Sequence, residues 1–272
     1  MPRPTAPTHS PVRPTTLAAF QRRLLRWYGR HQRPLPWRQT RDPYKILVSE
    51  VMLQQTQVDR VIPKYHQFLE RYPDLPTLAK SRLPELKKVW YPLGYNIRPL
   101  RLRQIAKTVV KHHAGLLPDS YDGLIALDGI GRYTAGAVLS FAFGKDAAIL
   151  DTNVARLLGR YFGVIGPAAV APADPTGTVT AAPKTGPKGR PKGATERRLW
   201  ELAALVIPPG NAYDINQAMM DFGAMICTAR KPACTGCALR KDCATYPYEK
   251  ASEQTSPVKP APAKRQRRDR AA

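Results

Sequence analysis

The chain has 272 residues, which is enough for one large domain or two small ones with a real hydrophobic core. Lys and Arg total 43 against 20 Asp and Glu, a net charge of +23 that favours a polyanionic partner such as nucleic acid. Because no apolar run approaches the roughly 18–20 residues that span a bilayer, and the N-terminus lacks the apolar stretch of a secretory signal, we expect a cytoplasmic protein and no membrane partner.

Proline dominates the first residues, and residues 1–14 are expected to be disordered. A helix is expected from about Thr16, since apolar residues recur at three- and four-residue steps from Leu17 to Tyr28. The segment "RPLPWRQTRDPY" then forms a proline-containing connector. Helix and connector together make an N-terminal unit over residues 15–42.

Helical spacing continues from Tyr44 to about Leu69, with a break expected at Pro63. Two more helices are expected at 83–91 and 98–113. Strict alternation of apolar and polar residues is almost absent, so the predicted fold class is all-α. We place one helical domain over residues 43–163.

The segment "LDGIGRYTAGAVL" places Gly129 and Gly131 in a tight turn between two helices. Glycine allows positive φ and the close approach of another backbone. The second helix begins near Arg132, so its free N–H groups offer a seat for a DNA phosphate. Taken alone, this pattern is also typical of an ordinary turn between helices; together with the cysteine run described below it becomes specific.

The composition changes between residues 164 and 195, where large apolar residues are almost absent. Such a segment buries too little apolar surface to offset its chain entropy, so we expect a disordered insertion. Helical spacing resumes at about Glu196 and continues through "INQAMMDFGAMIC". Residues 249–272 are polar and basic and are expected to form a disordered tail.

All four cysteines lie in one short segment with the spacing Cys-x6-Cys-x2-Cys-x5-Cys. Structural zinc sites more often use two separated Cys-x2-Cys pairs. One uneven run of four thiolates is more typical of a [4Fe–4S] cluster, which we favour over zinc and over four unligated thiols. We therefore predict a cluster domain over residues 196–248, with the ligands Cys227, Cys234, Cys237 and Cys243.

Several motifs occur in order along the chain: "LPWRQTRDPYKILVSEVMLQQTQV", "LGY", "GIGRYTAGAVLS", "ILDTNV" and "NQAMMDFGAMICTARKPACTGC". They resemble the helix-hairpin-helix (HhH-GPD) DNA glycosylases that carry an iron–sulfur cluster, and within them the MutY adenine glycosylases. The resemblance covers about residues 16–166 and 196–246. It implies a six-helix domain and a [4Fe–4S] cluster domain that flank a DNA-binding cleft, with the N-terminal helix packed on the cluster domain.

The same resemblance implies an activity. A MutY-like enzyme removes adenine mispaired with 8-oxoguanine or guanine from double-stranded DNA, as a step of base excision repair. We expect this protein to act as a monomer, associated with the nucleoid.

Two acids would carry the chemistry that the resemblance implies. Glu50 lies in the apolar run "ILVSEVML", where desolvation should raise its pKa and let it protonate the leaving base. Asp151 should stay ionised, held by Asn153 and the local backbone, and stabilise the positive charge that develops on the sugar. Tyr133 stands where lyase-active relatives carry a lysine that forms a Schiff base, so a monofunctional enzyme is expected.

By the same resemblance, two further sets of residues contact the DNA. The target base leaves the stack and enters a pocket, where Gln217 can offer adenine both a donor and an acceptor. Leu93 and Tyr95 are candidates to wedge between bases. The pocket set is Arg33, Trp37, Leu53, Val58 and Gln217, and the set that fills the gap and reads the opposite purine is Gln55, Thr56, Leu93 and Tyr95.

Two features depart from the family's pattern. Such enzymes usually carry a further C-terminal domain that helps to recognise 8-oxoguanine, whereas here a polar tail follows Cys243. The segment "GYNIRP" also lacks the usual second aromatic residue after Tyr95. We therefore expect mispairs of adenine with guanine and with 8-oxoguanine to be handled comparably.

Two other functions are compatible with the sequence. A thymine or uracil mismatch glycosylase shares the fold, the cluster, Glu50, Tyr133 and Asp151, although Gln217 together with "EVMLQQTQV" favours adenine. A non-catalytic protein that senses mispairs is the third hypothesis, and the two intact acids argue against it.

Overall fold

The computed structural model describes residues 12–94, 97–164 and 192–247. The Pro-rich residues 1–11, Tyr95, most of the expected insertion and the basic tail lie outside these ranges. The described ranges contain helices and no strand, which confirms the all-α prediction. Within them, no helix is both long enough and apolar enough to cross a membrane.

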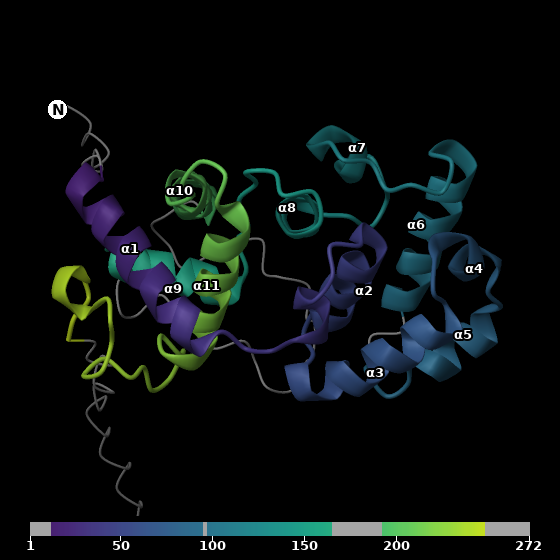
Figure 1. The fold of residues 1–272 in the computed structure, drawn as a ribbon, viewed down its shortest axis with the longest axis horizontal. Helices are drawn as coiled ribbons and strands as arrows, with labels where there is room; N and C mark the ends of the chain where they lie inside the picture. The colour runs from purple at the N-terminus through teal and green to yellow at the C-terminus, as the bar shows by residue number, and fades with distance from the viewer. Residues whose placement is uncertain (1–11, 95–96, 165–191, 248–272) are drawn as a thin grey trace, which may run out of the picture.

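The helices, shown in Figure 1, follow one another in the order α1 (Pro14–His31), η1 (Pro36–Arg38), α2 (Pro43–Leu53), α3 (Val58–Arg71), α4 (Leu75–Lys80), α5 (Leu83–Trp90), α6 (Ile97–His112), α7 (Tyr121–Ile125), α8 (Arg132–Phe141), α9 (Thr152–Tyr161), α10 (Lys192–Leu205), α11 (Ala212–Met225) and η3 (Arg240–Asp242).

The helices pack in two groups. Helix α11 packs against both α1 and α9, and α10 packs against α9. On the other side of the molecule, α2 packs against α8, α3 and α6, while α4 lies on α6 (Figure 1). Contacts between α8 and α11 join the two groups. Helices that are distant in sequence therefore contact one another where the two groups meet.

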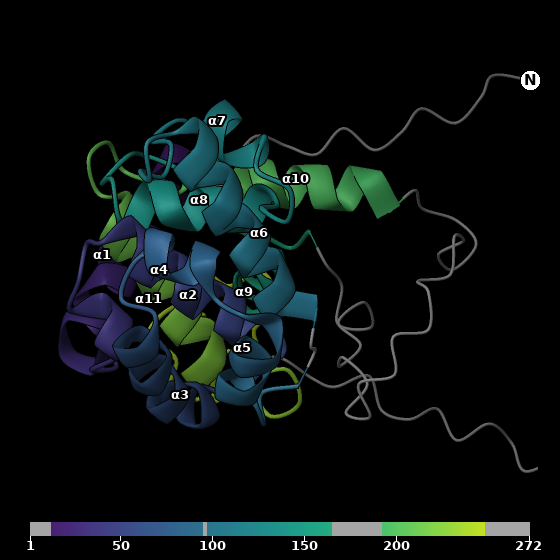
Figure 2. The same ribbon diagram turned by 90° about the vertical axis from the view of Figure 1, so that its right-hand side faces the viewer.

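Aromatic side chains hold the N-terminal helix in place. Phe20 is fully buried, and its ring centroid lies 4.8 Å from that of Tyr161 on α9. About two turns later, Trp27 meets the ring of Phe222 on α11 edge-on, also with the centroids 4.8 Å apart. The first helix thus packs on the helices that precede the cysteine segment, and it lies on the side of the molecule away from the projecting end of α10 (Figure 2).

The helix boundaries differ from expectation in three places. The break expected at Pro63 is wrong, because Pro63 lies inside α3 and the chain breaks instead at residues 54–57. Gln55 has a φ of 56°, a left-handed conformation that cannot continue an α-helix. The short helix α4 was not expected, and α10 begins at Lys192, within the segment expected to be disordered.

Candidate active site

Glu50 lies in the last turn of α2 and is 3% exposed. Its burial raises the pKa of the carboxyl to about 7; a hydrogen bond with Tyr133 opposes the rise, the nearby charge of Asp151 adds to it, and Arg38 opposes it. The Oε2 atom is buried without a hydrogen-bond partner among the described residues. Glu50 can therefore hold a proton near neutral pH, as the sequence indicated.

Asp151 is the N-cap of α9. Its Oδ1 accepts the backbone N–H of Val154 at 2.7 Å, and its Oδ2 accepts a hydrogen bond from the Asn153 amide at 3.1 Å. Burial raises the pKa of Asp151, while these hydrogen bonds and the charge of Arg156 oppose the rise. Asn153 thus holds the carboxylate as expected, and the donors around Asp151 favour its charged form.

Tyr133, in the first turn of α8, connects the two acids. Burial, the charges of Glu50 and Asp151, and its hydrogen bond to Glu50 together raise its pKa well above the ordinary value. A group that responds to both carboxyls must lie close to both. Two acids that are a hundred residues apart in the chain therefore interact with one tyrosine in the first turn of the helix that follows the glycine turn.

The buried residue Arg156 lies behind Asp151 and is hydrogen-bonded to Asn153. Arg156 donates to the Asn153 side-chain oxygen at 2.7 Å, to the Gly223 carbonyl at 2.6 Å and to the Cys227 carbonyl at 2.7 Å. A Cβ on Gly223 would come within 2.7 Å of the Asn153 carbonyl, so only glycine lets α11 approach α9 this closely. The cysteine segment, α11 and Asp151 are thereby connected through one side chain, which the sequence reasoning did not identify.

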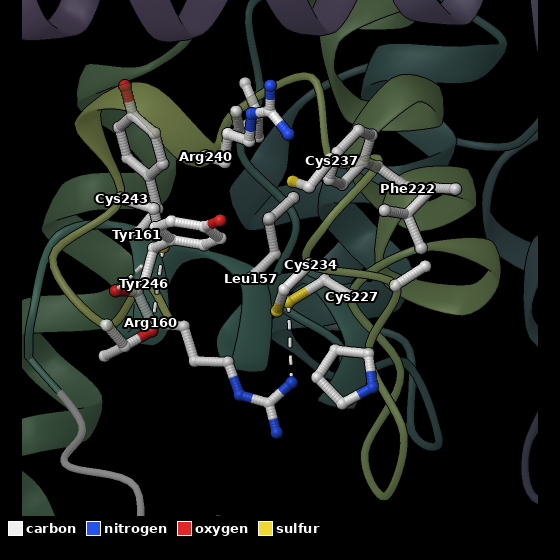
Figure 3. A pocket seen from close by; sticks show the side chains of 15 residues that line it. Leu157, Arg160, Tyr161, Phe222, Cys227, Cys234, Cys237, Arg240, Cys243 and Tyr246 are labelled. Carbon is white, nitrogen blue, oxygen red and sulfur yellow. Dashed lines mark hydrogen bonds between the residues drawn. The ribbon is translucent and has the colours of Figure 1, made fainter. Parts of the chain in front are cut away.

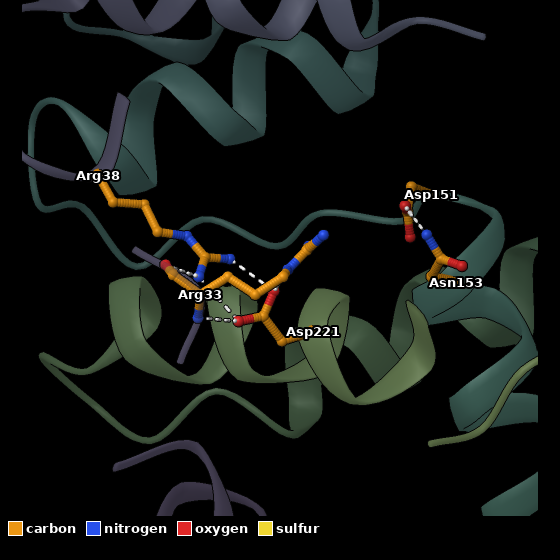
Figure 4. A network of polar contacts seen from close by, with 5 residues as sticks. All are labelled: Arg33, Arg38, Asp151, Asn153 and Asp221. Carbon is orange, nitrogen blue, oxygen red and sulfur yellow. Dashed lines mark hydrogen bonds and ion pairs between the residues drawn. The ribbon is translucent and has the colours of Figure 1, made fainter. Parts of the chain in front are cut away.

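A second buried network, drawn in Figure 4, lies on α11. Asp221 is fully buried and accepts a forked pair of hydrogen bonds from Arg38, both at 2.8 Å. Arg33 donates to Asp221 as well, from its Nε at 2.7 Å and from its backbone N–H at 3.1 Å. Each carboxylate oxygen of Asp221 therefore accepts two hydrogen bonds. These charge-assisted bonds hold the pKa of Asp221 below its ordinary value, although burial alone would raise it.

We expect Asp221→Asn to destabilise the fold by about 3 kcal/mol, because two guanidinium groups would lose their buried counter-charge. The Arg38 side chain is 7% exposed and cannot recover that charge from solvent. Asp214→Asn is the matched control, since Asp214 is exposed on the same helix. Urea unfolding of both variants and the wild type measures the difference; equal stabilities would contradict an energetic role for the network.

The predicted base-pocket residues come from four helices, η1, α2, α3 and α11, and from the segment between α1 and η1 that carries Arg33. Trp37 in η1 is buried edge-on against Tyr65 with centroids 5.5 Å apart. Gln217 is buried on α11, four residues before Asp221 and so on the same helical face. Asp221 in turn holds Arg33, whose guanidinium extends past it toward the side where Asp151 lies (Figure 4). The other two members, Leu53 and Val58, are half-buried at the facing ends of α2 and α3.

The residues expected to read the opposite base differ in exposure. Gln55 is exposed in its left-handed conformation, and Thr56 is half-buried beside it. Leu93 is only 5% exposed. The Leu93 side chain packs into the core and does not project from the loop, and its role as a wedge between bases stays a prediction. Tyr95 lies outside the described residues.

Only one of the two glycines in the turn, Gly129, has a backbone conformation that requires glycine. Gly129 has a φ of +98°, and a Cβ there would come within 3.4 Å of the Arg101 side chain. Gly131, the N-cap of α8, has extended backbone with a φ of −93° that any residue adopts. Arg132 begins α8 as expected, and its guanidinium lies 3.9 Å from the ring centroid of Trp200. The turn is present, and only its first glycine is required by the backbone.

The four cysteines line one cavity at the end of α9 and α11 (Figure 3). Apolar side chains, among them Leu157, Tyr161 and Phe222, make up much of the remaining wall. Burial raises the pKa of Cys237 to about 11, and Arg160 donates to the Cys227 sulfur at 3.5 Å. In the part of the chain that the structure describes, no three His, Cys, Asp or Glu side chains converge tightly enough for a single metal ion.

Comparison with known proteins agrees with this geometry. Residues 48–170 match the family described as HhH-GPD superfamily base excision DNA repair protein. The adenine DNA glycosylase of Buchnera aphidicola subsp. Baizongia pistaciae is 36% identical over 233 residues, which are 85% of this chain and 59% of that enzyme. The chain thus spans about three fifths of that relative's length.

Thymine glycosylases are also similar. The thymine/uracil-DNA glycosylase of Methanothermobacter thermautotrophicus is 33% identical over 234 residues, which are 84% of this chain and 93% of that enzyme. The solved structure of a thermostable thymine-DNA glycosylase superimposes with a TM-score of 0.72 at 32% identity, covering 86% of this chain and 97% of that one.

Proposed function

Because the chain belongs to the HhH-GPD superfamily of base excision DNA repair proteins, we propose that it is an adenine DNA glycosylase. It hydrolyses the N-glycosidic bond of adenine mispaired with 8-oxoguanine or guanine in double-stranded DNA, and it acts as a monomer. The observation that carries the proposal is a pair of acids, the buried Glu50 and the half-buried Asp151, that both interact with Tyr133.

The chemistry follows from the different surroundings of the two acids. With its pKa raised to about 7, Glu50 is protonated in a large share of molecules at neutral pH and can donate that proton to the departing adenine. It is then the base that activates the attacking water. Asp151 faces the sugar as a carboxylate, because its hydrogen-bond donors favour the charge, and it stabilises the oxocarbenium-like transition state.

The reaction stops at base release. A glycosylase with lyase activity needs an amine that attacks the sugar and forms a Schiff base. Tyr133 has a phenol in its place, and its hydrogen bond to Glu50 commits it to orienting the acid. We infer that the product is an intact strand with an abasic site.

Adenine is favoured as the target by the pocket. Gln217 is a buried polar residue on the face of α11 that also carries Asp221, and its amide can pair with the edge of adenine. Several of the similar proteins are named adenine DNA glycosylases. A thymine or uracil glycosylase is the second candidate, because the similar proteins whose full length this chain nearly covers carry that name.

We also propose that the four cysteines hold a [4Fe–4S] cluster. Four thiols around one largely apolar cavity suit a cluster in which each iron takes one thiolate, so the sulfurs need not converge as they do around a single ion. Such a centre would stabilise the segment after α11 by linking its four cysteines. Arg156 would connect this segment to Asn153, because it donates hydrogen bonds to both the Cys227 carbonyl and the Asn153 side chain. Iron and sulfide analysis of the isolated protein tests this assignment.

The function is tested with a panel of labelled duplexes that contain adenine opposite 8-oxoguanine or guanine, and thymine or uracil opposite guanine. We expect alkali-dependent strand breaks at adenine in the first two. Breaks confined to the thymine and uracil duplexes would support the second candidate and exclude the first. Breaks that form before alkali treatment would exclude a monofunctional enzyme.

A further inference from the structure

Arg98, the second residue of α6, is 4% exposed and makes hydrogen bonds in two directions. Its Nη1 donates to the carbonyls of Val51 at 3.1 Å, Met52 at 2.9 Å and Gln54 at 2.6 Å. Its Nη2 donates toward the loop that precedes α6 and toward Thr56. One guanidinium thus joins segments that are more than forty residues apart.

The first set of bonds caps the C-terminal end of α2. The last carbonyls of a helix have no partner within the helix, and they carry the negative end of its dipole. Here a buried cation satisfies them, one to two residues after Glu50. The terminal carbonyls of α2, the helix that carries Glu50, are therefore hydrogen-bonded by Arg98 of α6 instead of by water.

The second set of bonds acts on the loop before α6, residues 91–94. Nη2 of Arg98 donates to the Leu93 carbonyl at 2.9 Å and to the Gly94 carbonyl at 3.3 Å. The Trp90 ring lies 5.5 Å from the guanidinium, and its Nε1 donates to the same Gly94 carbonyl at 3.2 Å. Arg98 therefore determines how this loop lies against the end of α2.

Between these two sets lies a strained residue. Gln55 has a φ of 56°, which costs a non-glycine residue free energy unless its surroundings hold it. Arg98 bonds to the residue on each side of it, the Gln54 carbonyl at 2.6 Å and the Thr56 hydroxyl at 3.1 Å. The direction of the exposed Gln55 side chain thus depends on Arg98, a buried residue that cannot itself contact DNA.

We propose that Arg98 is a positioning residue for mispair recognition, which holds residues 54–57 and the 91–94 loop in the arrangement that accepts a mispaired duplex. The proposal rests on the proposed function, since it assigns these two segments to the DNA interface. It goes further in naming the group that couples the two segments to each other and to the helix end that carries Glu50.

The test compares Arg98→Lys with the wild type. Lysine keeps the positive charge, but one ammonium cannot span carbonyls on both sides as the guanidinium fork does. Fluorescence titration measures the dissociation constants for a fully paired duplex and for duplexes with adenine or thymine opposite guanine, whose target sugar carries a fluorine that resists cleavage. We expect the preference for the mispaired duplex to fall about tenfold to a hundredfold, while the affinity for the paired duplex changes less than about twofold because the charge is kept.

Two further variants keep a folding defect separate from a recognition defect. Thr56→Val removes the hydroxyl that accepts from Arg98 Nη2 and donates to the Gln54 carbonyl at 3.3 Å. It should lower the preference about threefold to tenfold without a loss of melting temperature. Arg82→Lys is the control, because the Arg82 side chain is 81% exposed in the same group of helices.

Four outcomes are informative. A smaller mispair preference in both Arg98→Lys and Thr56→Val supports the proposal. An equal loss of affinity for paired and mispaired duplexes, or an unchanged preference in both variants, overturns it. A wild type that prefers the thymine mispair refutes the adenine assignment and leaves the Arg98 comparison intact. A wild type with no preference for either mispair refutes both.

Discussion

Replacement of Glu50 by glutamine is expected to lower the rate of base excision by about a hundredfold to ten-thousandfold, the usual contribution of a positioned general acid. Glutamine has nearly the same shape as glutamate and can accept a hydrogen bond from the Tyr133 hydroxyl, so the surrounding packing is kept. It cannot release a proton to a leaving base. Duplex affinity should be unchanged, because Glu50 is buried and gives no positive charge to the DNA interface.

The pH dependence of the same variant provides an independent check. The folded pKa of Glu50 is raised from 4.5 to about 7, so the carboxyl stabilises the fold fully below pH 4.5 and loses that contribution as the pH rises through about 7. Glu50→Gln has no such loss. We expect the variant to melt at a higher temperature than the wild type above pH 7 and at a similar temperature in acid.

The wild-type excision rate at saturating enzyme should likewise fall as the pH rises through about 7, because only the protonated acid can donate. Glu85→Gln is the control, since the Glu85 side chain is 45% exposed on α5. A Glu50→Gln variant that excises at the wild-type rate would contradict the assignment of the acid. So would identical melting curves for Glu50→Gln and the wild type at every pH.

Replacement of Asp151 by asparagine is expected to lower the excision rate by about a hundredfold to a thousandfold, which is typical of removing one group that stabilises transition-state charge. Asparagine is as good an N-cap as aspartate and can still accept the Val154 N–H, so α9 should begin at the same residue. The change removes the negative charge that stabilises the sugar in the proposed mechanism. Binding to an uncleavable mispaired duplex should persist.

Asp74→Asn is a matched control for that experiment. Asp74 is the N-cap of α4 and accepts the Thr77 N–H at 2.7 Å, so the same chemical change is made at the same kind of helix end. Asp74 is exposed, and it is neither one of the two proposed catalytic acids nor a member of the predicted base pocket. If Asp151→Asn loses stability or duplex binding along with activity, while Asp74→Asn does not, the role of Asp151 is structural and the mechanism proposed here is wrong.

Arg156 links the Asp151 end of α9 to the cysteine segment. It donates to Asn153, which in turn donates to Asp151, and it also donates to the backbone carbonyl of Cys227. Asn153 therefore has two tasks, to donate to the carboxylate and to accept from the arginine. This double task explains why the amide follows the acid by two residues, where the first turn of α9 brings both side chains to the same end of the helix.

Local patterns in the sequence were sufficient for much of this structure. Helical spacing identified α5 and α6 within one residue at each end. The turn before α8, the four cysteines around one cavity and the burial of Glu50 also followed from short segments. Each of these features depends on residues close together in the chain, because periodicity, turn chemistry and the apolar character of neighbours are local properties.

The tertiary structure alone decided which charged groups pair inside the protein. Arg33 meets Asp221 across 188 positions, and Arg98 meets the end of α2 across more than forty. Nothing in a local pattern distinguishes these arginines from the many that face solvent, because what makes them different is the absence of water around a distant partner. The carbonyls of Gln54, beside the break at residues 54–57, and of Leu93 both accept hydrogen bonds from Arg98, a partner on α6 that no local pattern indicates.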